Sequence, residues 1–225
     1  MSDIRRFIFD RLNTGGTKLN QQEIRNAIYP GCFNRALIEL SRFRLFTDTF
    51  DIPPYTEADP NDYYENEQRQ QNTLYSSMAD CQLVLRYFAL KDESNIRGAM
   101  KSMLDRAMGS RIEISDTEAN GLIDDYKQRF SLLYELFAGK PFRLAADEQG
   151  RTRISASLYD SSMVAIDKLW ERCEDIRADL KGVQARLSAA LKDDVQLTVL
   201  TGQGNTANAV RSRIDLMRNI LSPVA

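Results

Sequence analysis

The chain of 225 residues contains no histidine. This absence excludes Ser-His and Cys-His nucleophile pairs, zinc sites with histidine ligands and any histidine general base. Cysteine is also scarce: Cys32, Cys81 and Cys173 are odd in number and far apart, and they predict neither a disulfide framework nor a zinc cluster. Each is expected to be a small buried apolar residue. Any chemistry must therefore use carboxylates, amines, hydroxyls or thiols.

Long apolar runs are missing as well. Stretches such as 163–166 are far shorter than the roughly 20 residues needed to cross a bilayer, and the first residues lack the apolar core of a secretion signal. With 43% hydrophobic residues, the chain can still bury a sizeable core. We therefore expect a soluble, cytoplasmic protein with no membrane partner.

Neither sign of charge dominates the whole chain, which has 30 basic and 32 acidic residues, so no global field attracts nucleic acid. Locally the balance changes. Residues 1–45 hold eight basic and four acidic residues, whereas residues 46–67 hold seven acidic and no basic residues, with three prolines. The acidic segment predicts an exposed loop over 46–71. The basic segment fits a phosphate-facing surface and a solvated helical face equally well.

The hydrophobic patterns predict one mainly α-helical, bundle-like domain over 1–225, with a helical body over 72–225 and at most one or two short strands. Helices are predicted over 4–12, 21–29, 34–45, 72–90, 96–107, 119–137, 158–173, 176–191 and 210–221. Most of these segments repeat apolar residues at helical spacing, whereas 21–29 is predicted from its end signals and the residues of 34–45 lie on mixed faces. Only 195–199 alternates as a strand would. Trp170 lies on an apolar stripe and is expected in the core.

Three helix starts carry capping signals. Asn20 with Glu23, and Ser115 with Glu118, have the spacing of a capping box, in which each side chain binds the other residue's backbone N–H. Ser94 is expected to cap the helix over 96–107. These signals predict where the helices begin.

Two glycine-containing turns precede predicted helices. The first, Thr14-Gly15-Gly16-Thr17, follows Arg11 and Asn13, and it could offer backbone N–H groups and a guanidinium to a phosphate. It lacks the ending of a P-loop, and a glycine pair also suits a plain turn between helices, which the residues alone favour. The segment 202–205 raises the same two interpretations, and there helix capping is favoured.

The first turn belongs to the segment FDRLNTGGTKLNQQEIRNAIYPGCFN, residues 9–34. This segment resembles the GmrSD-type restriction endonuclease N-terminal domain family, in which a helix, an Arg-Leu-Asn-Thr-Gly-Gly turn and a Leu-Asn-x-Gln-Glu-Ile-Arg-Asn helix occur together. The segments CQLVLRYFALKD, FAGKPFRL and RISASLYDSSMVAI are similar to later helical blocks of that family and stand in the same order.

The resemblance also shows what this sequence lacks. Family members begin with a ParB-like α/β half that carries an Asp-Gly-Gln-Gln-Arg motif linked to nucleotide hydrolysis or nicking. Many also carry an HNH nuclease, whose general base is a histidine. This sequence has neither the motif nor a histidine. The resemblance therefore implies the helical half of such a protein, from a split or truncated reading frame, that is not an enzyme on its own.

Carried over by position, the resemblance implies a phosphate, nucleotide or DNA site without catalytic or metal-binding residues. The binding residues are Arg11, Asn13, Gly15, Gly16 and Arg25, and the supporting residues are Thr14, Asn20 and Glu23. We expect Arg11 and the glycine amides to hold phosphate, while the helix of Glu23 and Arg25 buttresses the turn.

The implied function is a helical component of a modification-dependent restriction or anti-phage defence system. It would contribute DNA or nucleotide recognition or regulation rather than catalysis. The implied partners are a protein with the ParB-like half, DNA and a second copy of the chain. The chain has no cofactor of its own, and a nucleoside triphosphate with Mg would bind in the reassembled complex. The alternative is a non-catalytic helical interaction scaffold or a truncated remnant.

Overall fold

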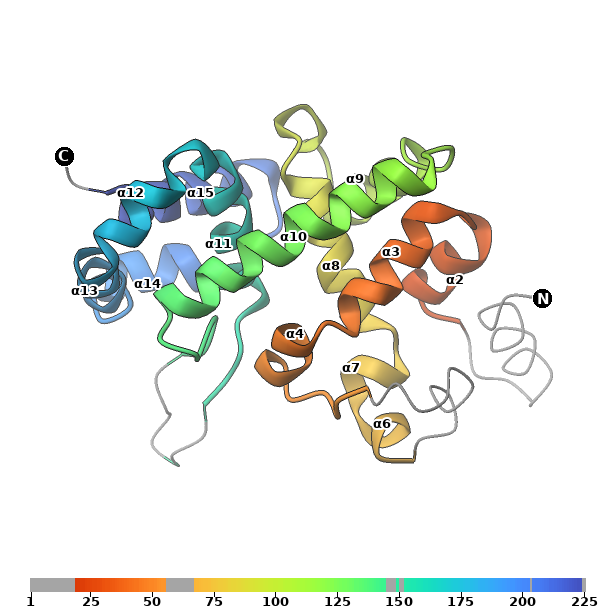
Figure 1. Cartoon of the computed structure of the whole chain (residues 1–225), viewed down its shortest axis with the longest axis horizontal. Coiled ribbons are helices and arrows are strands. Elements are labelled where there is room, and N and C mark those ends of the chain that lie inside the picture. The colour runs from red at the N-terminus through yellow and green to blue at the C-terminus, as the bar shows by residue number, and fades with distance from the viewer. Residues whose placement is uncertain (1–18, 56–66, 145–148, 150–151, 203, 224–225) are drawn as a thin grey trace. The chain divides into compact units, whose positions relative to one another are not determined.

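A computed structural model describes the chain except for residues 1–18, 56–66, 145–148, 150–151, 203 and 224–225 (Figure 1). The described residues are all-helical, which confirms the predicted mainly α fold. They form 13 α-helices and two 3-10 helices, and one isolated antiparallel bridge joins Arg143 and Ile154. The helix expected over 4–12 lies outside the described residues.

No helix in the described part of the chain combines the length and the apolar character needed to cross a membrane.

Backbone contacts divide the chain into two compact units. Unit 1 comprises Met1–Leu85 and Leu104–Asp124, and unit 2 comprises Arg86–Met103 and Asp125–Ala225. The divisions fall within α8 (Ala79–Leu90), α9 (Met100–Gly109) and α10 (Asp116–Leu136). The expectation of a single folding domain stays a prediction.

Unit 1 is built from short helices around an apolar core. Besides parts of α8, α9 and α10, it contains α2 (Gln21–Ile28), α3 (Cys32–Ser41), α4 (Arg44–Thr49), α6 (Glu67–Gln71) and α7 (Thr73–Ser76). Phe33, Leu37 and Leu40 recur at helical spacing on α3 and are buried. Because these residues all face one side, α3 contributes a continuous apolar stripe to this core.

Three predicted segments of unit 1 need correction. The helix expected over 34–45 begins earlier and is interrupted at Phe43, whose extended backbone separates α3 from α4. The loop expected over 46–71 is helical at both ends, in α4 and α6. At its first end Phe46 and Phe50 are buried, and their ring centroids lie 4.6 Å apart.

The single helix expected over 72–90 is two helices, α7 and α8. Met78 interrupts it with φ 54°, a conformation that non-glycine residues rarely adopt. At this break the buried Met78 sulfur accepts a hydrogen bond from the Asn26 side chain at 3.0 Å. A long-range contact thus overrides the local helical pattern.

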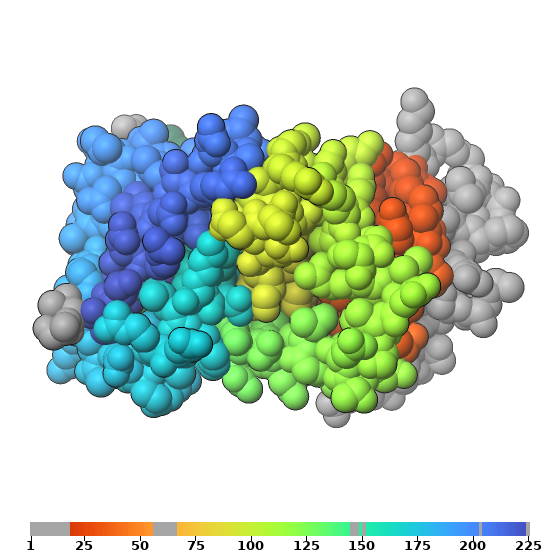
Figure 2. All heavy atoms as spheres, turned by 90° about the horizontal axis from the view of Figure 1, so that it is seen from above, coloured from red at the N-terminus to blue at the C-terminus, as the bar shows by residue number. Residues whose placement is uncertain are grey.

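Unit 2 is organised around a buried helix. Its elements, besides parts of α8 to α10, are η1 (Glu93–Asn95), α11 (Ala156–Lys168), η2 (Trp170–Arg172), α12 (Cys173–Ala178), α13 (Leu180–Ala190), α14 (Asp194–Thr201) and α15 (Ala207–Leu221). Every residue of α11 over 158–166 is buried, and α11 packs against both α14 and α15 (Figure 1). In Figure 2, blue residues of α15 lie beside the cyan segment that contains α11.

Aromatic side chains fill the remaining core of unit 2. The rings of Tyr87, Phe88, Tyr126, Phe130, Phe142 and Tyr159 contact one another in a chain of edge and stacked pairs. The Tyr126 and Tyr159 hydroxyls share a hydrogen bond of 3.0 Å, which satisfies both polar groups inside the core.

The strand expected over 195–199 is wrong, because these residues form α14. Asp193 caps this helix by accepting a hydrogen bond from the Gln196 N–H at 2.8 Å. The prediction that Ser94 caps the next helix is wrong too: Asp92 accepts the Ser94 N–H at 3.0 Å and starts η1 instead. For the segment 195–199, five residues of alternating pattern were too few to distinguish a strand from a helix.

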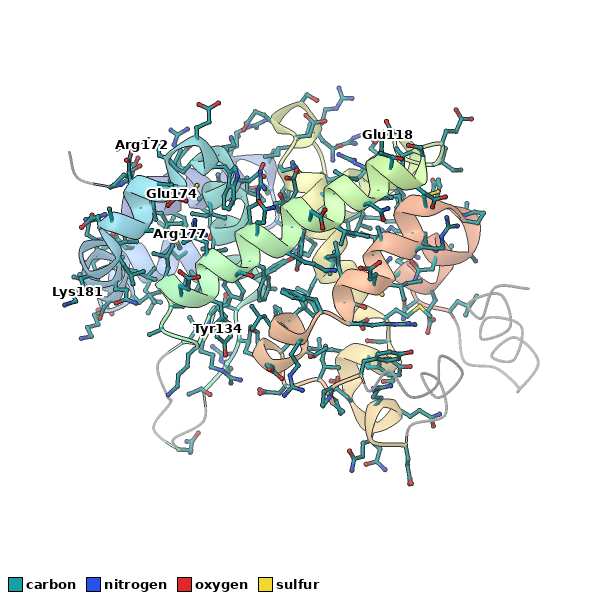
Figure 3. All side chains as sticks on the ribbon, viewed as in Figure 1. Glu118, Tyr134, Arg172, Glu174, Arg177 and Lys181 are labelled. Carbon is teal, nitrogen blue, oxygen red and sulfur yellow. The ribbon has the colours of Figure 1, made fainter. Side chains whose placement is uncertain are left out.

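Several other expectations are confirmed. The apolar residues Ile96, Met100, Met103, Leu104 and Ala107 are buried, as are Val210, Ile214, Met217 and Leu221 of α15. Ser115 and Glu118 form a capping box at the start of α10, and Figure 3 labels Glu118 there. The expectation that every cysteine is buried is confirmed only for Cys81. It is wrong for Cys32 and Cys173, which are partly exposed.

Candidate functional site

The structure describes only part of the predicted site. Arg11, Asn13, Thr14, Gly15 and Gly16 lie outside the described residues. Asn20, Glu23 and Arg25 are described and belong to unit 1, where Asn20 caps α2, Glu23 lies in its first turn and Arg25 in its last turn. The structure therefore shows the geometry of the supporting helix, α2.

Asn20 and Glu23 form the predicted capping box. The Asn20 Oδ1 atom accepts hydrogen bonds from the N–H groups of Gln22 and Glu23 at 2.9 and 3.0 Å, and a Glu23 carboxylate oxygen accepts the Asn20 N–H at 2.7 Å. The Asn20 side chain also donates to the Ser77 carbonyl at 2.8 Å. This capping box therefore both starts α2 and ties it to the chain segment before α8.

Arg25 is an internal anchor of unit 1. Its side chain is only 4% exposed, and its Nε atom donates to an Asp105 carboxylate oxygen at 2.7 Å. The neighbouring polar side chains of Gln22 and Asn26 are also buried and share a hydrogen bond of 2.8 Å. This arrangement agrees with a buttressing role for the Glu23 and Arg25 helix, whereas direct ligand binding by Arg25 stays a prediction.

A buried acid lies elsewhere in unit 1. Asp80 is 2% exposed and accepts the Cys81 N–H at 2.8 Å. Burial raises the pKa of Asp80 to about 7, although hydrogen bonds from Cys81 and Ser41 oppose the rise. Nothing in the local pattern marked Asp80, because its unusual pKa depends on tertiary burial.

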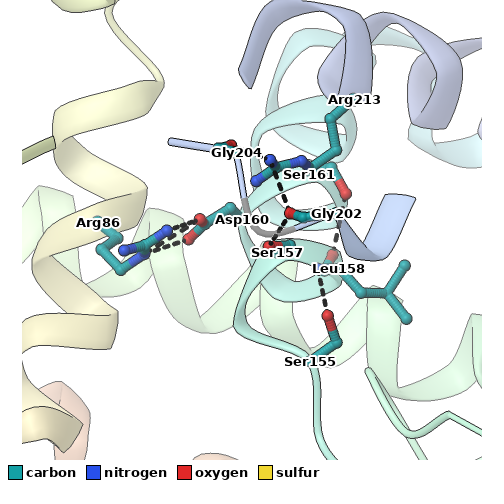
Figure 4. A network of polar contacts seen from close by, with 9 residues as sticks. All are labelled: Arg86, Ser155, Ser157, Leu158, Asp160, Ser161, Gly202, Gly204 and Arg213. Carbon is teal, nitrogen blue, oxygen red and sulfur yellow. Dashed lines mark hydrogen bonds and ion pairs between the residues drawn. The ribbon is translucent and has the colours of Figure 1, made fainter. Parts of the chain in front are cut away.

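Unit 2 contains a buried ion pair that sequence patterns did not reveal (Figure 4). Arg86 of α8 donates from Nε to both Asp160 oxygens, at 2.9 and 3.0 Å, and from Nη2 to one of them. Asp160 lies on α11 with 1% of its side chain exposed. The two residues are 74 positions apart, so only the fold brings them together.

A second polar cluster of unit 2 surrounds Asp167. Its carboxylate accepts hydrogen bonds from the Tyr87 hydroxyl at 2.8 Å and from Arg129 Nε at 3.0 Å. The Arg129 guanidinium lies 4.2 Å from the centroid of the Trp170 ring. Trp170 is thus a partly exposed platform for a cation, and the expectation that it lies in the core is wrong.

Exposed charged side chains at the end of η2 and on α12 form ion pairs at the surface. Arg172 pairs with Asp175, and Arg177 pairs with Glu174, each at a spacing of three residues (Figure 3). Such solvated pairs contribute little to stability. They fit the ordinary solvated face of a helix.

The described residues contain no group of three or more histidine, cysteine or carboxylate side chains that could hold a metal ion. Their buried polar groups instead anchor α2 in unit 1 and pair Arg86 with Asp160 in unit 2. Comparisons with protein-family models, curated proteins and solved structures found no match for this chain.

Proposed function

We propose that this chain is a helical component of a GmrSD-like, modification-dependent restriction or anti-phage defence system, in which it contributes DNA or nucleotide recognition or regulation rather than catalysis. The observation that carries the proposal is the segment 9–34, with its Arg-Leu-Asn-Thr-Gly-Gly turn and Leu-Asn-x-Gln-Glu-Ile-Arg-Asn helix. The later helical segments in the same order support it.

The contacts at the start of α2 support a division of roles within that segment. Asn20, Glu23 and Arg25 are engaged with Ser77, with one another's backbone and with Asp105, so they hold the helix that follows the glycine turn. Arg11 and the amides of Gly15 and Gly16 are then the groups left for a phosphate, with Asn13 and Thr14 beside them in sequence.

Catalysis would come from another chain. The sequence has no Asp-Gly-Gln-Gln-Arg motif, so a partner with the ParB-like half would supply the reacting groups, and a nucleoside triphosphate with Mg would bind in that complex. Arg11 would contribute affinity for phosphate through charge and hydrogen bonding without touching the reacting atoms.

The direct test is to recover the tagged chain from its native cell, to identify associated proteins by mass spectrometry, and to measure nucleotide and DNA binding by the recovered complex. We expect a partner with the Asp-Gly-Gln-Gln-Arg motif and binding that requires the complex. Arg11→Ala should weaken this binding. Arg44→Ala is the matched control, because Arg44 lies in the same basic segment but is exposed and paired with Asp48. Equal binding by both variants would remove Arg11 from the site.

A second candidate function is a helical interaction scaffold with no ligand at the glycine turn. The observation that favours it is a set of exposed large apolar side chains: Val195 and Val199 lie one turn apart on α14 and are 74% and 36% exposed, and Ile28 of α2 is 60% exposed. A recovered complex that contains partners but binds neither nucleotide nor DNA would support this function over the first.

A further inference from the structure

Arg213 of α15 is a buried cation without a carboxylate partner. The residue is 2% exposed, and in the described part of the chain no aspartate or glutamate forms an ion pair with it. The nearby Asp160 carboxylate is already occupied by three hydrogen bonds from Arg86 (Figure 4). Within this cluster of Arg86, Asp160 and Arg213, two guanidinium groups and one carboxylate therefore leave one positive charge in excess.

The hydrogen bonds of Arg213 use only one of its three nitrogens. Nη2 donates to the Gly202 carbonyl at 3.1 Å and to the Gly204 carbonyl. The Nε and Nη1 atoms are buried and have no acceptor among the described residues. A buried donor without an acceptor is strongly unfavourable, so these two nitrogens identify a place where an acceptor is needed.

The two carbonyl contacts explain only part of the arrangement. Gly202 is the C-cap of α14, and a cation beside the carbonyl end of a helix is favourable. Ser157 of α11 donates to the same carbonyl at 3.2 Å, so the segment has a second anchor. A clamp of this kind needs Nη2 alone, which leaves Nε, Nη1 and the net charge unaccounted for.

Arg213 cannot relieve the charge by losing its proton. Burial and the neighbouring Arg86 lower the pKa of Arg213, while Asp160 raises it. A guanidinium nevertheless remains protonated in proteins, unlike a buried carboxyl or amine. An anion that accepts hydrogen bonds from Nε and Nη1 would both satisfy these donors and neutralise the excess charge.

We propose that Arg213 is the centre of a phosphate-binding site in unit 2, bordered by the Arg86–Asp160 pair and by the start of α15. A guanidinium offers several N–H donors to phosphate oxygens, and the amino-terminal end of the 15-residue α15 adds positive potential. The burial of Arg213 favours a small enclosed phosphate group over an extended nucleic-acid backbone. This site uses none of the residues in segment 9–34 and goes beyond the function proposed above.

The test is calorimetric titration of the full-length protein with inorganic phosphate and, separately, with ATP, at constant ionic strength and with chloride as the reference anion. We expect saturable binding of at least one of the two phosphate compounds and none of chloride. Tighter binding of ATP would place the phosphate on a nucleotide, and equal or tighter binding of inorganic phosphate would indicate the free ion. Absence of saturable binding by the wild-type protein would overturn the proposal and leave Arg213 as a loop clamp.

Variants connect the binding to Arg213. Arg213→Lys keeps the charge but loses the planar fork of donors, so its affinity should fall at least about tenfold. Arg218→Gln is the matched control, because Arg218 lies on the same helix with an exposed side chain and should leave affinity unchanged. Equal affinity in Arg213→Lys and the wild type would contradict the proposal. If Arg213→Lys does not fold, a phosphate-dependent shift of the Arg213 Nε–H resonance in the wild type decides the question.

Binding at Arg213 should survive Arg11→Ala. Its loss in that variant, with the fold intact, would place the bound phosphate at the glycine turn and overturn the assignment to Arg213. The failure of this site is thus distinguishable from the failure of the function proposed above.

Discussion

Each unit buries a charged side chain that has no oppositely charged partner among the described residues, and the two cases differ in how the charge can be met. Asp80 of unit 1 is a buried acid whose pKa is about 7, so it can take up a proton near neutral pH. Arg213 of unit 2 is a buried base that cannot discharge in this way. Burial therefore makes the charge of Asp80 in unit 1 depend on pH, whereas it leaves Arg213 in unit 2 charged and suited to bind an anion.

Arg25 of unit 1 can be compared with both Asp80 and Arg213, because it is a buried charge that has an oppositely charged partner. It is as buried as Arg213, but the Asp105 carboxylate lies 2.7 Å from its Nε atom. Arg25 therefore needs no external anion, and a buried arginine alone does not indicate a ligand site. The presence or absence of an internal carboxylate distinguishes an anchor from a candidate binding residue.

Removing the carboxylate beside the two arginines of unit 2 should have the largest effect on stability. Asp160→Ala leaves Arg86 without its partner and removes the acid closest to Arg213, so we expect the free energy of unfolding to fall by about 5 kcal/mol. Urea unfolding measures the change. The exposed Asp175→Ala on α12 is the control, and a loss as small as the control's would show that the buried pair contributes little.

The buried acid of unit 1 should make stability depend on pH. Its pKa is higher in the folded state, about 7, than the ordinary 3.8, so the folded state binds more protons between these values. The contribution of Asp80 to the free energy of unfolding therefore falls as pH rises from about 4 to about 7, by up to about 4 kcal/mol, and is constant above.

Asp80→Asn should abolish that dependence, because asparagine resembles the protonated acid. The variant and the wild type should have similar stability near pH 4, and the variant should be the more stable near pH 8. Chemical unfolding across this pH range measures the difference. Parallel pH profiles for the two proteins would show that the pKa of Asp80 is not raised in the folded state.

The anchor of α2 should be weaker than the buried pair of unit 2. Asp105→Ala leaves Arg25 without its carboxylate, but Asp105 is 40% exposed, so water can reach the gap and we expect a loss of about 2 kcal/mol. The measurement is again urea unfolding, compared with Asp160→Ala. Equal losses in the two variants would remove the distinction between the two ion pairs.

The two helix caps, Asn20 of α2 and Thr206 of α15, should show the smallest difference in the free energy of unfolding that is lost on substitution. Asn20→Ala loses the capping bonds and the contact with the Ser77 carbonyl, whereas Thr206→Ala loses only the bond to the Ala209 N–H. We expect about 2 kcal/mol for Asn20→Ala and about 1 kcal/mol for Thr206→Ala. Differential scanning calorimetry of both variants measures which one loses more stability. A larger loss of stability for Thr206→Ala than for Asn20→Ala would contradict the prediction.

Local signals in the sequence predicted local structure well. The Asn20–Glu23 and Ser115–Glu118 spacings gave two capping boxes, and the apolar spacing of α15 gave its buried face. Each of these features depends on residues within one or a few turns. Where the local signal was short, as over 195–199, the cap at Asp193 and packing against α11 and α15 decided the structure instead.

The charged groups of the interior could not be predicted in the same way. Arg86 looked like a basic residue near a helix end, and Asp160 like one polar residue among serines, because nothing local relates positions 74 residues apart. The same applies to Asp80 and Arg213. Their properties depend on burial in the fold and on the lack of an oppositely charged partner among the described residues. Of the predicted site, the structure describes the supporting helix, and the binding role of Arg11 and the glycine turn stays a prediction.

The most direct test of the account compares two buried arginines in one experiment. The Nε–H resonances of Arg25 and Arg213 are recorded in the wild-type protein by proton–nitrogen NMR, assigned through their side-chain connectivity to the backbone, and followed during titration with inorganic phosphate at constant ionic strength. The account predicts a saturable shift of the Arg213 resonance and an unchanged Arg25 resonance, because only Arg213 lacks an internal carboxylate. An unchanged Arg213 resonance, or equal shifts of both, would contradict it.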